Sequence, residues 1–99
     1  MDLATITKVF TENAAKASGG MDKALKFVLD EGIVHIDFTG DSPVVSNDDK
    51  DADCTITTSL STIDDIRTGK QNPMMAVMTG KVKIQGDMSL AMKLQSLFS

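Results

Sequence analysis

The spacing of the apolar residues changes along the chain, and each change predicts a different secondary structure. Between residues 2 and 17 apolar side chains recur every three or four positions, which is the spacing of one helix face. These side chains are Leu3, Ile6, Phe10, Ala14 and Ala17. Asp2 is a suitable N-cap, and Gly19-Gly20 is a suitable stop. We therefore expect a first helix that packs its apolar face on a core.

From Lys23 the apolar residues alternate with polar ones, which is typical of strands with one buried face. Residues 23–29 and 34–39 predict a hairpin that turns at Glu31-Gly32. His35 falls among the polar positions, so we expect its side chain to face solvent. A short third strand over residues 44–46, a polar loop over 47–51 and a β-branched fourth strand over 54–59 follow.

Two short helices are predicted between the fourth strand and a fifth strand over residues 81–85. Ser61 and Asp64 form a capping pair for the first of them. Asn72-Pro73 gives the second an N-cap and a proline at its first position, and the helix presents Met74, Val77 and Met78 to one side. We expect Gly69 and Gly80 to end these helices.

Residues 88–98 predict a terminal helix capped by Asp87 and apolar around most of its circumference. Gln95 is a lone polar side chain inside the apolar arc, which also contains Phe98. A helix with so many apolar residues needs other parts of the protein packed on two of its sides, or an apolar ligand on one of these sides. The alternative is an interaction module, in which the arc binds a partner protein or a second copy of the chain.

Composition limits the possible functions. A chain of 99 residues that is 41% apolar and 24% charged is expected to form one domain, residues 1–99. A net charge of −4 without a basic stripe argues against nucleic-acid binding. The single cysteine, Cys54, and an N-terminus without a signal-peptide pattern favour a cytoplasmic location.

The candidate catalytic and metal-binding patterns are incomplete. The run Asp49-x-Asp51-x-Asp53 imitates the start of a calcium loop, but its sixth position is Cys54 and its twelfth is Leu60, where glycine and glutamate are required. His35 is the only histidine. Cys54 begins a strand and is expected to be a structural thiol. We therefore expect no metal, no cofactor and no enzymatic activity.

Several motifs in the second half occur at the spacing of one known family. They are Asp53-Cys54-Thr55-Ile56-Thr57, Thr68-Gly69-Lys70, Asn72-Pro73, Gly80-Lys81-Val82-Lys83-Ile84 and the run from Met88 to Gln95. Together they strongly resemble the sterol carrier protein type-2 family. Before Asp53 the likeness lies in the order of elements. The resemblance implies an α+β fold with a five-stranded, mostly antiparallel sheet, helices covering one face and a hydrophobic tunnel between them.

The resemblance also implies a function and a set of ligand-binding residues. Members of the family bind and move sterols, fatty acids, fatty acyl thioesters and phospholipids without altering them. The expected ligand-binding residues are Met74, Val77, Met78, Met88, Met92, Leu94, Gln95 and Phe98. Gln95 could pair with the polar head of a lipid, or it could be satisfied by backbone or water at the helix edge.

The expected partners follow from the same resemblance. They are a lipid ligand and, beyond it, a transient membrane contact or a lipid-metabolising enzyme, because such domains occur fused to enzymes in this family. The N-terminal helix is less basic than the family's membrane-contacting helix, which argues against electrostatic docking through it.

Overall fold

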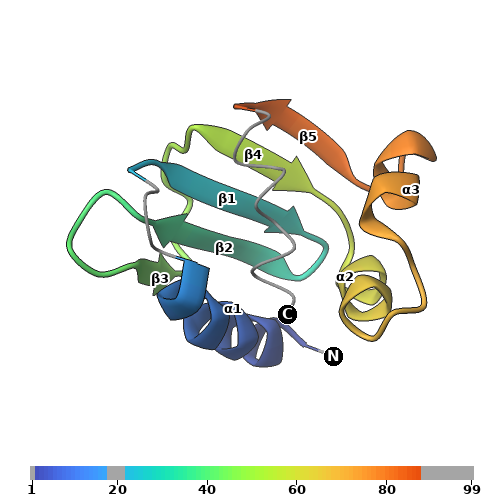
Figure 1. The fold of residues 1–99 in the computed structure, drawn as a ribbon, viewed down its shortest axis with the longest axis horizontal. Coiled ribbons are helices and arrows are strands. Elements are labelled where there is room, and N and C mark those ends of the chain that lie inside the picture. The colour runs from blue at the N-terminus through green and yellow to red at the C-terminus, as the bar shows by residue number, and fades with distance from the viewer. Residues whose placement is uncertain (1, 18–21, 88–99) are drawn as a thin grey trace.

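The computed structural model describes residues 2–17 and 22–87, which form three helices and a sheet (Figure 1). In chain order the elements are α1 (Leu3–Ala17), β1 (Ala24–Leu29), β2 (Gly32–Asp37), β3 (Val44–Ser46), β4 (Cys54–Thr57), α2 (Leu60–Arg67), α3 (Pro73–Met78) and β5 (Lys83–Gly86). The sheet has five strands in the order β3-β2-β1-β4-β5.

Three strand pairs are antiparallel and one, β1 with β4, is parallel. The parallel pair arises because residues 47–53 carry the chain from β3, at one edge, past β2 and β1 to β4. The chain then turns back through α2 and α3, so that β5 pairs antiparallel with β4. This arrangement confirms the expected α+β fold with a mostly antiparallel five-stranded sheet.

The core lies on one face of the sheet, where the alternate residues of β1, β2 and β4 are buried. In the register of the strands Phe27 lies between Val34 and Ile56, and Leu25 lies between Ile36 and Cys54. Both rows are therefore continuous bands of apolar side chains across the three central strands. Such a face has to be covered by helices to be kept from water.

The N-caps of the three described helices were predicted correctly in two cases; the terminal helix that Asp87 was expected to cap lies outside the described residues. The Asp2 carboxylate accepts a hydrogen bond from the Thr5 amide at 2.8 Å, as expected for α1. Asn72 caps α3 through bonds from the amides of Met74 and Met75. The prediction for α2 was wrong, because Ser59 and not Ser61 is the cap; its hydroxyl accepts from the Thr62 amide. The earlier cap also ends β4 at Thr57, before the predicted boundary.

The loop of residues 47–53 covers the opposite face of the sheet around His35, so the prediction for His35 was wrong. His35 is only 3% exposed, and its ring Nε2 donates to the Asp51 carbonyl oxygen at 3.0 Å. On the neighbouring strand the Lys26 ammonium pairs with the Asp49 carboxylate at 2.9 Å. Alternation correctly placed both residues opposite the core, but the crossing loop keeps that part of the sheet from solvent.

Candidate functional site

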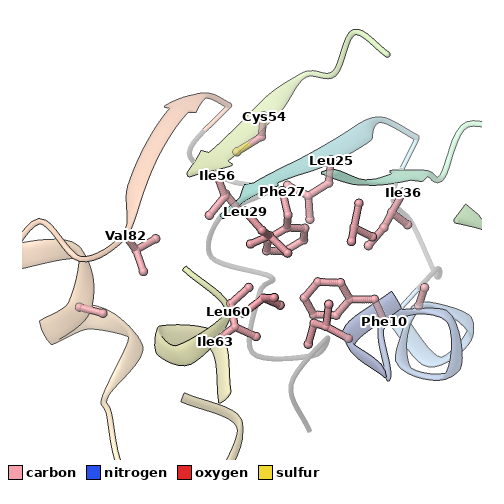
Figure 2. Packing of buried hydrophobic residues seen from close by; sticks show 14 of the residues in the cluster. Phe10, Leu25, Phe27, Leu29, Ile36, Cys54, Ile56, Leu60, Ile63 and Val82 are labelled. Atoms are coloured by element: carbon pink, nitrogen blue, oxygen red, sulfur yellow. The ribbon is translucent and has the colours of Figure 1, made fainter. Parts of the chain in front are cut away.

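A cluster of buried apolar side chains lies between the sheet and helices α1 and α2 (Figure 2). Phe10 of α1 stacks on Phe27 of β1, with ring centroids 4.5 Å apart and the planes inclined by 29°. Leu60 and Ile63 of α2 complete this cluster, and both are buried. Shape-filling contacts of this kind make this part of the interior a structural core.

Helix α3 stands at the end of the molecule away from α1, next to β5 (Figure 1). Its anchor is Ala76, which is fully buried and whose carbonyl oxygen accepts hydrogen bonds from the amides of Lys81 and Val82. Val82 is also buried. The chain therefore folds back on α3 before β5 begins at Lys83, which explains why the fifth strand starts later than predicted.

Three of the expected ligand-binding residues belong to α3, and they have different surroundings. Val77 is half-buried and packs against the core cluster. Met74 is 67% exposed and Met78 is 77% exposed. The spacing correctly placed them on one short helix, but within the described residues only Val77 joins the core.

The remaining five expected ligand-binding residues lie outside the described residues. They are Met88, Met92, Leu94, Gln95 and Phe98. The structure therefore neither supports nor contradicts their role, and it stays a prediction. The hydrophobic tunnel that the resemblance implies also stays a prediction.

The point where the chain enters residues 88–99 is held in place by contacts that no sequence signal indicated. The Asp87 amide donates to the Asp53 carbonyl oxygen at 2.9 Å, and the Asp87 carboxylate forms an ion pair with Lys23. The Asp53 carboxylate accepts from the Ala24 amide at 2.8 Å. These bonds tie the start of β1, the start of β4 and the end of β5 together.

The one thiol of the chain, Cys54, lies within the described residues. Cys54 is fully buried, and this burial, with a smaller effect of the Asp87 carboxylate, raises the pKa of its thiol. Such a thiol is a poor nucleophile at neutral pH, as expected for a structural cysteine. Within residues 2–17 and 22–87 no group of three or more His, Cys, Asp or Glu side chains could hold a metal ion. No helix in the same ranges is long and apolar enough to span a membrane.

Comparison with known proteins gives two kinds of relative. Sterol carrier protein 2 of Bos taurus is 53% identical over 58 residues, which are 59% of this chain and 11% of that protein. Hydroxysteroid dehydrogenase-like protein 2 of Xenopus laevis is 31% identical over 94 residues, which are 93% of this chain and 22% of that protein. The chain therefore spans less than a quarter of the length of either relative.

A solved structure extends the comparison to the fold. The sterol carrier protein domain 2 of Helicoverpa armigera superposes with a TM-score of 0.77 at 28% identity, covering 95% of this chain and 83% of that one. The sequence profile of the SCP-2 sterol transfer family matches residues 4–99. This chain belongs to the SCP-2 sterol transfer family.

Proposed function

We propose that this chain binds a single lipid through the lipid's apolar part and carries it without altering it. The observation that carries the proposal is the family match, which extends over residues 4–99 and so includes both the described sheet and the predicted terminal helix. A sterol, a fatty acid and a fatty acyl thioester are the candidate ligands, because each has an apolar body that a methionine-rich wall could enclose.

The driving force would be the removal of apolar lipid surface from water, which contributes about 25 cal/mol per Å². Immobilising the lipid opposes binding by several kcal/mol, so only part of this stabilisation would appear as affinity. Methionine side chains adapt to ligands of different shape, and five of the chain's seven methionines fall in residues 74–92. We therefore expect affinity for several lipids and little discrimination among them.

Val77 is the described residue that connects this proposal to the structure. It belongs to α3, which contains the first predicted wall residues, and it also packs against the core cluster. A ligand held between α3 and the predicted terminal helix would then rest on a part of the molecule fixed by Ala76 and Val82. We propose that α3 forms the rigid half of the binding site.

Titration of the purified protein with a fluorescent fatty acid tests the proposal. Saturable enhancement of fluorescence at micromolar concentrations is expected, and an unlabelled fatty acid, sterol or acyl thioester should each displace the probe if it is a ligand. The order of displacement identifies the preferred class. A linear, non-saturating signal would contradict the proposal.

A matched pair of variants in the terminal segment tests where the lipid binds. Stepping 100° per residue places Leu94 in the apolar arc and Lys93 on the polar side of the predicted helix. Leu94→Arg should weaken capture of the fluorescent fatty acid more than Lys93→Ala does. Equal losses from the two changes would refute this assignment of helix faces.

The length of the relatives suggests a setting for this activity. In the Xenopus laevis relative the matched region is 22% of a protein named for its likeness to a hydroxysteroid dehydrogenase. We propose that this chain presents a bound lipid to a lipid-metabolising enzyme, and that it does so in the cytoplasm. Lipid captured by the purified protein should then be consumed by such an enzyme faster than the same lipid free in water.

A further inference from the structure

The charge of this protein is unevenly distributed along the chain. Residues 66–86 contain four of the ten basic residues and none of the fourteen acidic ones. This stretch includes all of α3 and both of its connections. An acidic protein therefore has one basic segment, and that segment is built around a single short helix.

The same segment exposes large apolar side chains. Met74, Met75 and Met78 of α3 are 67%, 51% and 77% exposed. Within the described part of the chain the only other large apolar side chain exposed to this degree is Val44, on β3 at the opposite edge of the sheet. Exposed apolar groups gathered on one element, with a polar rim, usually indicate an interaction surface.

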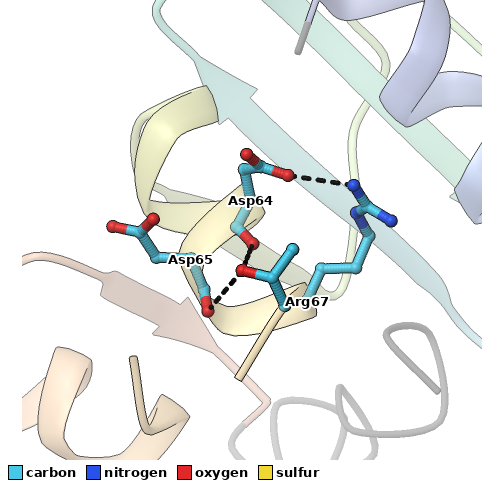
Figure 3. Close-up of polar contacts among 4 residues, drawn as sticks. Asp64, Asp65 and Arg67 are labelled. Atoms are coloured by element: carbon cyan, nitrogen blue, oxygen red, sulfur yellow. Dashed lines mark hydrogen bonds and ion pairs between the residues drawn. The ribbon is translucent and has the colours of Figure 1, made fainter. Parts of the chain in front are cut away.

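The basic residues next to these methionines differ in how far their charge is already balanced. The Arg67 guanidinium pairs with the Asp64 carboxylate at 2.9 Å, so its positive charge already has a negatively charged partner within α2 (Figure 3). The Lys81 ammonium instead donates to the neutral amide oxygen of Gln71 at 3.2 Å. Its own amide bonds to Ala76 of α3, which fixes Lys81 beside that helix. Lys70, on the other connection of α3, is exposed.

Helix α1 does not offer a comparable surface. Among the side chains of α1 that the structure describes, the exposed ones are Ala4, Thr5, Lys8, Thr11, Glu12 and Ala15. Lys8 and Glu12 balance each other in charge, and none of these side chains is large and apolar. Its larger apolar residues, such as Ile6 and Phe10, are buried in the core. An anionic, partly apolar surface would therefore gain little from contact with these described side chains of α1.

We propose that α3 docks this protein on an anionic lipid bilayer, through a patch made of Lys70, Met74, Met75, Met78 and Lys81. The methionines enter the boundary between headgroups and acyl chains, and the two ammonium groups contact lipid phosphates and carboxylates. The inference rests on the proposed function, since a lipid carrier has to meet the membrane from which it takes its cargo. Met74 and Met78 also belong to the expected ligand-binding residues, so the docking surface and the predicted binding site meet on α3.

The test is co-sedimentation of the whole chain with vesicles made of equal parts of phosphatidylcholine and phosphatidylserine. Lys81→Gln is compared with Lys8→Gln, which removes the same charge from α1. Met75→Ser is compared with Val44→Ser, which removes an exposed apolar group from β3. The Met75 backbone supplies the bonds to Asn72 and Thr79, so neither bond depends on the side chain.

Lys81→Gln should weaken vesicle binding about five-fold, because each basic group near an anionic surface adds roughly that factor. Met75→Ser should weaken it about ten-fold, the effect of withdrawing one methionine from apolar surroundings. Lys8→Gln and Val44→Ser should bind as the unmodified protein does. Vesicles of phosphatidylcholine alone should bind less protein.

Three results would overturn the proposal. The first is that the unmodified protein does not bind the vesicles. The second is that the two control variants lose as much binding as the α3 variants do. The third is that light scattering shows self-association of the unmodified protein, that Met75→Ser abolishes it, and that no vesicle binding is seen. The last would assign α3 to contact between copies of the chain. Each variant is also titrated with the fluorescent fatty acid in the absence of vesicles. Normal titration with no vesicle binding refutes the docking surface alone, whereas no titration in the unmodified protein refutes the proposed function.

Discussion

Replacing Gly86 by alanine should disrupt the junction between β4, β5 and the predicted terminal helix. Gly86 has a φ of +102° and lies opposite Cys54 in the sheet. A Cβ atom there would overlap the Asp53 carbonyl oxygen and lie 3.2 Å from the Cys54 Cα. Both atoms belong to the backbone, so the overlap can be relieved only if the two strands move apart.

The size of the effect follows from three contributions. The backbone conformation costs a non-glycine residue about 1–3 kcal/mol. Forcing the strands apart adds about 1–3 kcal/mol. The reduced freedom of the unfolded chain gives back about 0.4–1 kcal/mol. We expect Gly86→Ala to lower the free energy of unfolding by about 3 kcal/mol, out of the roughly 5–15 kcal/mol typical of a domain.

Gly80→Ala is the matched control. Gly80 also has a positive φ, +80°, but a Cβ at this position meets no atom within 4 Å. Its cost is therefore the backbone contribution alone, about 1 kcal/mol after the gain from the unfolded state. In urea, with a slope of about 2 kcal/mol per M, the midpoint should fall by roughly 1.5 M for Gly86→Ala and about 0.5 M for Gly80→Ala. Equal shifts would refute the claim that the Asp53 carbonyl excludes a side chain at position 86.

Three further predictions concern the core and two titrating groups. Phe10→Ala removes the stack on Phe27 and should cost about 4 kcal/mol, lowering the thermal midpoint by roughly 15–30 °C; a fall of only a few degrees would contradict the packing described. The hydroxyl and then the amide of Thr39 hold the pKa of Asp37 below its ordinary value of 3.8. Thr39→Val should therefore raise the pKa of Asp37 in an NMR titration. The stability that the lowered pKa contributes is present above pH 3.8, and it is lost as the pH falls through the pKa of Asp37 in the folded protein. Cys54 should react with a thiol reagent at neutral pH only as fast as the protein unfolds, and rapid labelling of the folded protein would show that the thiol is accessible.

The parts of the fold that were predicted correctly depend on neighbouring residues. The Asn72-Pro73 pair defines the start of α3 because the asparagine side chain and the proline ring act within one helical turn. The hairpin of β1 and β2 follows from alternation on both sides of a tight turn, which lies at Asp30-Glu31, one residue earlier than the expected Glu31-Gly32. In both cases the residues that determine the element lie within a few positions of it in the sequence.

The errors and omissions depend on residues far apart in the chain. His35 is buried because a loop between two other strands crosses over it, and alternation carries no information about that loop. The ion pair of Lys23 with Asp87 joins residues 64 positions apart. Spacing placed Met74, Val77 and Met78 on one side of a short helix, but it could not show that Val77 packs against the core while Met74 and Met78 remain exposed. Exposure depends on the whole fold.

The central claim is that this chain removes one lipid molecule from water and holds it. Native mass spectrometry of the whole protein, after incubation with an equimolar mixture of a sterol, a fatty acid and an acyl thioester, tests it most directly. We predict a complex of one protein with one lipid, whose added mass identifies the preferred class. A spectrum that contains only the bare chain would contradict the claim and leave the fold without its proposed function.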